Sequence, residues 1–480
     1  MLTIPGRKGT LCDGPTRREL MRVGSVGLFG LNLANFFQWQ QLQGAPRLEG
    51  TRGFNSAKSV ILVFLQGGPS HIDIWDPKPD APSSIRGEFK PINTNVAGIQ
   101  LSETMPMLAQ QMDKCALIRS MSYTPTGLFN HTAAIYQMLT GYPPDKVSPS
   151  GQLEPPSAAD FPTAGSHISK LRPPSEPVLP FVEMPRPLQE SGVIGKGGAA
   201  GFLGKAYDPY RLYQDPNKPI SLEDLTLRKD VPADRLKDRF TMLKDINSSM
   251  PDLEKALKDY AIDEYYGKAF DLVLSGKARA AFDLSKESDK VRERYGRTTF
   301  GQGLLLSRRL IEAGTRFVQM NWPAVANGNP EVDAWDTHAA NFGPLKNLHC
   351  PIFDRGISAL IEDLSQRGMF KDTLLVTVGE FGRSPRLGVS TSGNTNSPDG
   401  RDHWPYCYTA LVAGAGMQTA RLYGASDQTA SSPKDKPVHP NDLLATVYHS
   451  LGIDPDMTVL NHLNQPRELV KGKPVLDLWA

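Results

Sequence analysis

The sequence predicts an α/β protein, specifically a three-layer α/β/α sandwich around a mostly parallel central sheet. Short apolar, β-branched segments alternate with stretches of helical spacing, which is typical of strands covered by helices on both faces. Polar side chains directly follow several of these segments, as they do where parallel strands end at a ligand-binding edge. With 480 residues, the chain is long enough for one large domain with an insertion. We expect this domain at 55–480 and a helical insertion at about 205–310.

The strands and helices are predicted from these patterns in chain order. Strands are expected at 60–65, 115–121, 316–321, 373–378 and 408–414. Helices are expected at 130–141, 345–367 and 443–451, with further charged helices between 221 and 310. Residues 142–200 are rich in Pro, Gly and Ser and are expected to form surface connections.

The charge balance and the cysteines exclude two classes of protein. The chain has 53 basic and 51 acidic residues, and no basic run contains interleaved aromatic residues, so we expect no nucleic-acid partner. Its four cysteines have no CxxC spacing. A disulfide framework is therefore not expected, although a single bridge stays open.

Residues 1–45 are expected to be an export signal. Arg17 and Arg18 precede a weakly apolar segment, residues 23–37, which contains three glycines. This arrangement resembles a twin-arginine signal, and the segment is too short and too polar to span a bilayer stably. We therefore expect the twin-arginine machinery to export the protein to the periplasm or the extracellular space. The alternative is an amphipathic helix in which two arginines are adjacent by chance.

Acidic and imidazole side chains lie next to the ends of four of the predicted strands. These candidates are Asp73 after the first strand, Asp336 and His338 after 316–321, Glu380 after 373–378, and Asp402 and His403 before 408–414. Carboxylates and imidazoles bind zinc, calcium or manganese, so we expect one or two divalent metal ions. In the alternative reading these residues are helix caps and loop hydrogen-bonding groups, with Asp336 capping a helix that starts at Thr337.

Three further residues are candidates for the catalytic step. His131 and Thr132 lie on the first turn of the predicted helix 130–141, where the helix dipole favours anions. Arg383 follows Glu380 closely, and its guanidinium group is suited to holding an oxyanion. The alternative role for Arg383 is a surface ion pair.

The chain resembles a secreted bacterial family known only as domain of unknown function 1501, which is related to the alkaline phosphatase and sulfatase superfamily. The resemblance rests on the twin-arginine start and on the motifs at 67–73, 335–338, 379–383 and 401–405. It implies an alkaline phosphatase-like fold. It also implies that Asp73, Asp336, His338, Glu380 and His403 bind metal, with the nucleophile position at His131 rather than at a serine or threonine.

The resemblance implies a secreted, metal-dependent hydrolase of phosphate or sulfate esters that acts on an anionic ester or polysaccharide. In that scheme His131 or Thr132 attacks and Arg383 holds the anion. The alternative is a catalytically inactive extracytoplasmic protein that binds glycans or assembles at the cell surface.

Overall fold

The computed structural model describes residues 48–144, 155–190, 193–212, 232–250, 276–323 and 334–479. The predicted export signal at 1–45 lies outside these residues. So does much of the chain between 213 and 275, and the predicted insertion at 205–310 therefore stays a prediction. None of the described helices has the length and apolar character needed to cross a membrane.

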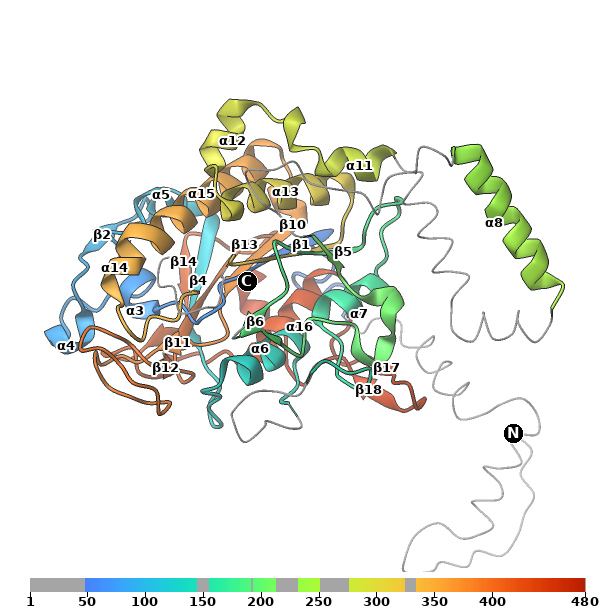
Figure 1. Cartoon of the computed structure of the whole chain (residues 1–480). Helices are drawn as coiled ribbons and strands as arrows, with labels where there is room; N and C mark the ends of the chain where they lie inside the picture. The colour runs from blue at the N-terminus through green and yellow to red at the C-terminus, as the bar shows by residue number, and fades with distance from the viewer. Residues whose placement is uncertain are drawn as a thin grey trace, which may run out of the picture.

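An eight-stranded sheet forms the centre of the domain (Figure 1). Its order is β14 (Arg421–Tyr423), β4 (Cys115–Met121), β13 (Tyr408–Gly414), β10 (Thr373–Val378), β1 (Ser59–Phe64), β9 (Phe317–Asn321), β5 (Phe181–Met184) and β8 (Tyr210–Arg211). All neighbouring pairs are parallel except the two pairs that include β13. The prediction of a mostly parallel sheet is therefore confirmed, and most strands end at the same edge.

The central strand β1 explains why the sheet needs two covering layers. All six of its residues are buried. Ile61 and Val63 belong to one hydrophobic core, whereas Val60, Leu62 and Phe64 belong to the other. Successive strand side chains point to opposite faces, so an uninterrupted apolar run is stable only when both faces are covered.

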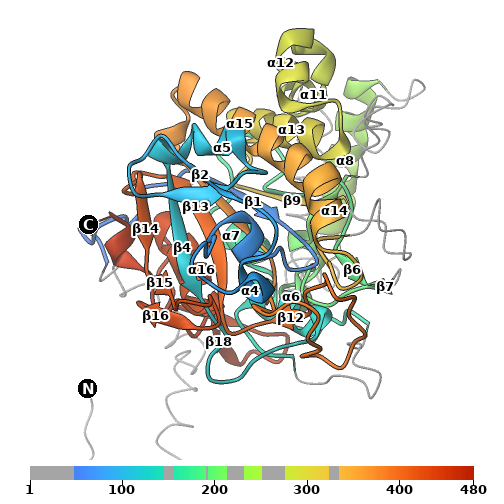
Figure 2. The same ribbon diagram turned by 90° about the vertical axis from the view of Figure 1, so that its left-hand side faces the viewer.

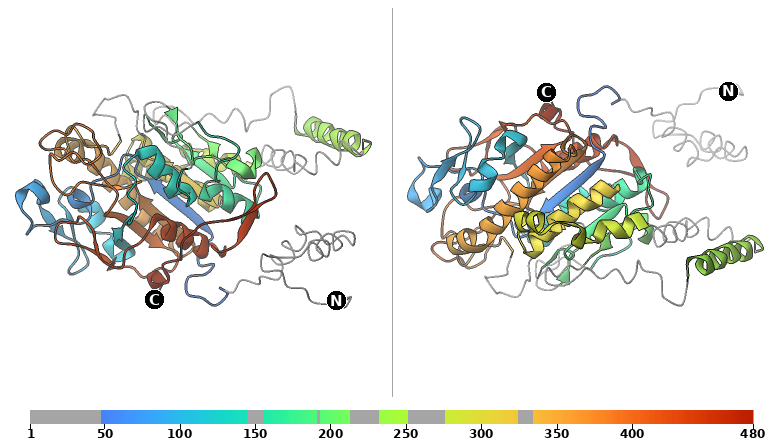
Figure 3. Two further views of the ribbon diagram at one scale, coloured as in Figure 1. Left: turned by 90° about the horizontal axis from the view of Figure 1, so that it is seen from below. Right: turned by 90° about the horizontal axis from the view of Figure 1, so that it is seen from above.

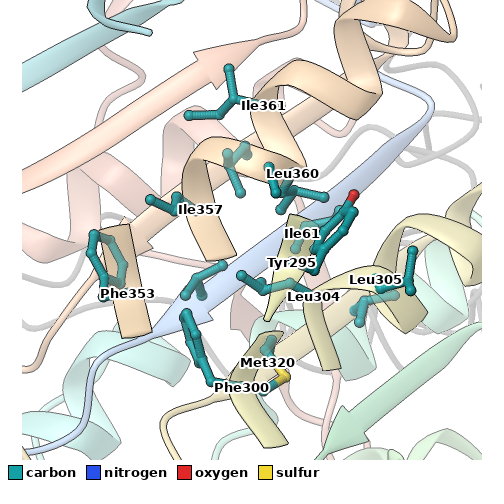
Figure 4. Packing of buried hydrophobic residues seen from close by; sticks show 14 of the residues in the cluster. Ile61, Tyr295, Phe300, Leu304, Leu305, Met320, Phe353, Ile357, Leu360 and Ile361 are labelled. Atoms are coloured by element: carbon teal, nitrogen blue, oxygen red, sulfur yellow. The ribbon is translucent and has the colours of Figure 1, made fainter. Parts of the chain in front are cut away.

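Helices cover the two faces of the sheet. On one face lie α13 (Thr299–Ala313) and α15 (Cys350–Gln366), and on the other lie α6 (His131–Thr140), α7 (Ala164–Leu171) and α16 (Pro440–Ser450) (Figures 2 and 3). Leu304 of α13 and Ile357 of α15 pack over Ile61 (Figure 4). This arrangement is the predicted three-layer sandwich.

The ends of α6 follow from its sequence. Asn130 caps the first turn by accepting a hydrogen bond from the Ala133 amide at 3.0 Å. Gly141 ends the helix with a φ of 79°, in the left-handed region that a residue with a Cβ rarely adopts. The predicted helix and its glycine stop are thus confirmed.

The prediction for residues 142–200 was wrong in part. β5 and α7 lie in this range, and both are buried against the sheet. Prolines and glycines, which indicate loops, flank both short elements. Because these residues are so frequent in the range, the sequence did not predict β5 or α7. The helical range beyond residue 205 contains α8 (Ala233–Ser248), α11 (Gly276–Phe282), α12 (Asp289–Tyr295) and α13, of which α13 packs directly on the sheet as part of the core.

The remaining elements are short. They are helices α3 (His71–Ile74), α4 (Ser83–Arg86), α5 (Pro106–Ala109) and α14 (Phe342–Pro344), a π-helical turn (Leu345–His349), and the strand pairs β2–β3 (Pro91–Asn93, Gln100–Ser102), β6–β7 (Gln189–Glu190, Val193–Ile194), β11–β12 (Gly382–Arg383, His403–Trp404), β15–β16 (Ala425–Ser426, Pro433–Asp435) and β17–β18 (Thr458–Leu460, Pro466–Glu468).

The core packing predicts unequal effects of two truncations. Ile357 is fully buried, whereas Met107 is 44% exposed. Ile357→Ala should lower the free energy of unfolding by about 2–5 kcal/mol because it leaves a cavity under α15, and Met107→Ala by less than about 1 kcal/mol. Urea denaturation followed by circular dichroism measures both. Equal losses for the two variants would contradict the packing described here.

Candidate metal centre

Two glycines shape the turn at the end of β1. Gly67 has a φ of +107°, and a Cβ there would lie 2.5 Å from the backbone nitrogen of Trp335. A Cβ on Gly68, whose φ is +69°, would lie 2.6 Å from the ring of Phe381. Only glycine combines a positive φ with room for such close neighbours at these two positions. The turn therefore permits the segment that carries Asp336 to lie directly against the end of β1.

Glu380 connects three elements at this edge. It follows β10, and its side chain is fully buried. Its Oε1 accepts a hydrogen bond from the Gly67 amide at 2.8 Å and contacts His131 Nδ1 at 2.5 Å. Because His131 is the first residue of α6, one carboxylate joins the ends of β1 and β10 to the start of that helix.

Three imidazole rings converge on the Asp336 carboxylate. Its Oδ1 lies 2.9 Å from His338 Nε2 and 3.4 Å from His403 Nε2, and its Oδ2 lies 3.3 Å from His131 Nε2. The Nε2 atoms of His338 and His403 are only 2.8 Å apart. The structure thus brings together residues from three separate chain segments.

Each of these imidazoles has an oxygen acceptor at its other nitrogen. His131 Nδ1 faces Glu380, His338 Nδ1 lies 2.7 Å from Asn396 Oδ1, and His403 Nδ1 lies 2.5 Å from the carbonyl oxygen of Phe129. An acceptor at Nδ1 fixes the proton on that nitrogen and directs the Nε2 lone pair away from it. The three Nε2 atoms then all face the Asp336 carboxylate. Histidine metal ligands are commonly oriented in this way.

The charges of the group shift the pKa values of its members. Burial alone would lower the pKa of His131, but the carboxylates of Asp336 and Glu380 outweigh it and raise this pKa to about 10. Burial and the positive charge of His131 lower the pKa of His403 to about 3. For Asp336, burial favours the neutral form, yet the charges of Arg383 and His131 hold its pKa well below the usual range. Asp336 is therefore a carboxylate and His403 a neutral base.

Arg383 is buried beside this group. Its Nε donates to the Gly68 carbonyl at 2.8 Å and its Nη1 to the Arg401 carbonyl at 3.2 Å. Its Nη2 donates to the Gly67 carbonyl and pairs with Asp336 Oδ1. These contacts use most of its five N–H donors, and they fix the glycine turn and the Asp336 carboxylate relative to each other.

Asp73 lies in a separate ion pair. Its carboxylate receives Arg401 Nε at 2.6 Å and Nη2 at 3.1 Å. Asn341 Nδ2 and Ser70 Oγ also donate to it, at 2.7 Å and 2.5 Å. Both charged side chains are fully buried. The structure therefore does not bring Asp73 together with the three imidazoles, although it too follows β1.

Asp402 and Thr132 also have their polar atoms engaged. Asp402 accepts hydrogen bonds from the amides of Thr391 and Ser392 at 2.5 Å and 2.8 Å. Burial opposes ionisation of Asp402, but the hydrogen bonds from Ser392 and Thr391 outweigh it and lower its pKa to about 2. The Thr132 hydroxyl donates to Asn130 Oδ1 at 2.6 Å.

Asn396 and the carbonyl of Phe129 are the groups at the site that the sequence did not indicate. Asn396 lies in a loop rich in Gly, Ser, Thr and Asn, where an asparagine has many alternative roles. A backbone carbonyl carries no signal in the sequence. The short spacing of Phe129 from His131 is the one feature that could have suggested it.

The buried pair of Asp73 and Arg401 yields a prediction about stability. Asp73→Asn leaves the charge of Arg401 buried without its partner and should lower the free energy of unfolding by about 3–5 kcal/mol. The matched control is Asp372→Asn, which removes the pair between Asp372 and Lys58, whose side chain is 73% exposed, and should cost less than about 1 kcal/mol. Urea denaturation measures the difference, and metal analysis of the Asp73→Asn protein should give the wild-type metal content. Loss of metal without loss of stability would show that Asp73 is a ligand.

No match is found among curated proteins. Solved structures with a related architecture include the PsFucS1 sulfatase from Pseudoalteromonas sp. (11% identity, TM-score 0.35, covering 88% of this chain and 72% of the sulfatase). The chain is also similar to a phosphonate monoester hydrolase from Silicibacter pomeroyi (12% identity, TM-score 0.36, covering 88% of this chain and 77% of that one) and to a mutant of the alkaline phosphatase PafA (10%, 0.43, 88% and 99%). The profile described as "Protein of unknown function (DUF1501)" matches residues 57–479, and the chain therefore belongs to this family.

Proposed function

We propose that this protein is an exported, metal-dependent hydrolase of phosphate or sulfate esters. The observation that carries the proposal is the convergence of three imidazole Nε2 atoms on one carboxylate, with an oxygen acceptor behind each ring. His131 Nε2 is buried and lies 3.3 Å from Asp336 Oδ2, but it makes no well-formed hydrogen bond among the described residues. A metal ion at the meeting point would satisfy this nitrogen more fully.

The donor set indicates which metal fits. Two groups of potential ligands share His403: one contains His131 and Asp336, and the other contains His338 and Asp402. His338 Nε2 also lies 2.9 Å from Asp336 Oδ1, so the three imidazoles and Asp336 would together supply three nitrogens and one carboxylate. Calcium takes oxygen ligands only, whereas zinc readily accepts imidazole and carboxylate together. We therefore infer one zinc ion as the best fit, with manganese as the second choice. Asp402 would support the loop at residues 391–392 rather than bind a second ion, because its oxygens already accept several hydrogen bonds.

The site has an open side through which an ester could approach. The Asp336 side chain is 35% exposed, whereas those of His131 and His403 are 9% and 5% exposed. A bound cation would supply Lewis-acid polarisation of a phosphoryl or sulfuryl oxygen. The amides of His131 and Thr132, the first two of α6, have no acceptor within the helix and would bind the anionic oxygens of the ester.

Glu380 and Arg383 would act indirectly, by fixing the protonation or the orientation of the metal ligands. Glu380 would keep a proton on His131 Nδ1, so that this ring presents only Nε2 to the ion. Arg383 would orient Asp336, because its other donors are bonded to backbone carbonyls, apart from a contact of 3.4 Å between Nη1 and His338 Nε2. In this scheme His131 binds metal rather than acting as the nucleophile, and water is the attacking group.

A second candidate function is binding without catalysis. The Thr132 hydroxyl is bonded to the cap residue Asn130, so the helix start presents no free hydroxyl of its own. A protein that uses the same site only to bind an anionic ester or glycan outside the cytoplasm fits this observation. Measuring whether the protein cleaves an ester distinguishes the two functions.

Metal analysis and turnover test the proposed site together. The purified protein should contain about one zinc or manganese ion per chain. His403→Ala and Asp336→Ala should lose most of it, and Glu380→Gln should weaken binding about 10- to 100-fold. The control His462→Ala, at an exposed histidine far along the chain, should keep its metal. Aryl phosphates, phosphodiesters and sulfates are the substrates for the activity assay.

If the wild-type protein cleaves none of these esters but holds the metal, the binding function replaces the hydrolase. If His403→Ala and wild type carry equal metal, the proposed ligand set is wrong.

The pKa of His131 predicts how metal affinity depends on pH. In the metal-free protein this ring stays protonated up to about pH 10, so a metal must displace its proton to bind Nε2. Apparent affinity should therefore rise by about tenfold per pH unit between pH 7 and 9, and level off above the pKa. A chelator-competition titration measures the slope. An affinity independent of pH in this range would contradict the role of His131 as a ligand.

A further inference from the structure

Three aromatic side chains lie together next to the candidate metal centre. Phe129, Trp404 and Tyr406, which we call the aromatic platform, are all partly exposed. The ring centroids of Phe129 and Tyr406 are 5.6 Å apart, and those of Trp404 and Tyr406 are 5.3 Å apart, both with edge-on geometry. The proposed scheme gives none of these side chains a role.

The platform is directly connected to one of the proposed metal ligands. Trp404 is the residue after His403, and the carbonyl of Phe129 is the acceptor for His403 Nδ1 at 2.5 Å. The backbone at Phe129 and at His403–Trp404 therefore joins the platform to the proposed centre.

The rings of the platform are held in place. The indole Nε1 of Trp404 donates to the Ser431 carbonyl at 2.7 Å, which fixes that edge of the ring. A Cβ on Gly127 would lie 2.8 Å from Cζ of Tyr406, so the backbone at Gly127 packs closely against this ring. Partly exposed aromatic rings that are fixed by hydrogen bonding and close packing lose little conformational entropy when a ligand binds.

Neutral hydroxyl groups flank the platform. The Thr391 hydroxyl donates to the His403 carbonyl at 2.7 Å, which places the Ser- and Asn-containing loop beside Trp404. On the other flank, the hydroxyls of Thr429 and Ser431 share a hydrogen bond of 2.7 Å. The nearby guanidinium groups of Arg383 and Arg401 are fully buried and bonded to protein groups. These surroundings favour a polar, uncharged ligand surface over a nucleic acid.

We propose that the aromatic platform binds a sugar ring of the substrate, so that the esters cleaved at the metal centre are esters of a saccharide. This inference rests on the proposed hydrolase function and assigns its substrate class. A pyranose ring presents an apolar C–H face that packs on an aromatic ring, while its hydroxyls require polar partners at the rim. Pockets that combine aromatic walls with a few polar groups bind ligands of this kind.

Comparing the kcat/KM values of two substrates tests the role of the platform in catalysis. The ratio of kcat/KM for a monosaccharide sulfate or phosphate to that for the corresponding ethyl ester should fall roughly fivefold to tenfold in Trp404→Ala. Trp404→Phe, which keeps an aromatic face, should restore most of the ratio. Trp479→Ala is the matched control, because this partly exposed indole also donates to a backbone carbonyl, that of Ala415, beyond the far end of β13. It should leave the ratio at its wild-type value.

Sugar binding tests the platform without catalysis. EDTA-treated full-length protein would be titrated calorimetrically with neutral β-glucan, galactan and mannan hexasaccharides, and with a proline-rich peptide. At least one hexasaccharide should bind, and Trp404→Ala should weaken that binding while Trp479→Ala does not.

The two experiments separate the two proposals. Sugar binding that depends on Trp404 without ester cleavage would overturn the hydrolase function and leave the platform supported. Ester cleavage with an unchanged saccharide-to-ethyl ratio would overturn the platform alone. Binding of the peptide in place of every hexasaccharide would also overturn it.

Discussion

The arrangement of this edge of the sheet depends on the carboxylate of Glu380. Its Oε1 accepts a hydrogen bond from the Gly67 amide and contacts His131, the first residue of α6. This one oxygen therefore connects the ends of two strands to the start of a helix. The other oxygen, Oε2, is buried without a hydrogen-bond partner among the described residues. A buried carboxylate in this state is costly unless it is compensated by charge, and the proximity of His131 provides that compensation.

The parallel sheet places the ends of several strands at one edge, and two glycines allow the segments there to lie close together. β1, β9 and β10 are adjacent and parallel, so the chain leaves all three at one edge. β13 runs in the opposite direction and starts at this same edge, which brings His403 to it from the preceding loop. Without Cβ atoms at Gly67 and Gly68, the neighbouring segments can lie against the turn. The polar group is therefore a consequence of strand order and of two backbone positions.

The sequence predicted the elements that have a strong local pattern. Strands β4, β10 and β13 were predicted with the bounds observed, because continuous apolar runs are unambiguous when both faces are buried. β5 was missed, since its four residues lie between prolines, and its burial depends on pairing with β9, which is distant in the chain. Long-range pairing of this kind leaves no periodicity to detect.

For the site, the sequence indicated residue types but not their partners. His338, Glu380 and His403 lie together, as their positions after strands suggested. Asp73 has the same kind of position, yet the buried guanidinium of Arg401, more than 300 residues away, takes its carboxylate. Whether a carboxylate faces a histidine or an arginine depends on packing across the sheet edge, and the local sequence does not encode it.

The central claim is that three imidazoles and one carboxylate surround a single metal ion. X-ray absorption spectroscopy of the zinc-loaded protein tests it most directly, because it reports the ligand atoms around the ion. The account predicts three imidazole nitrogens at about 2.0–2.1 Å and a carboxylate oxygen, with one further position taken by water. A shell of oxygen atoms alone, or one with a single imidazole, would contradict it.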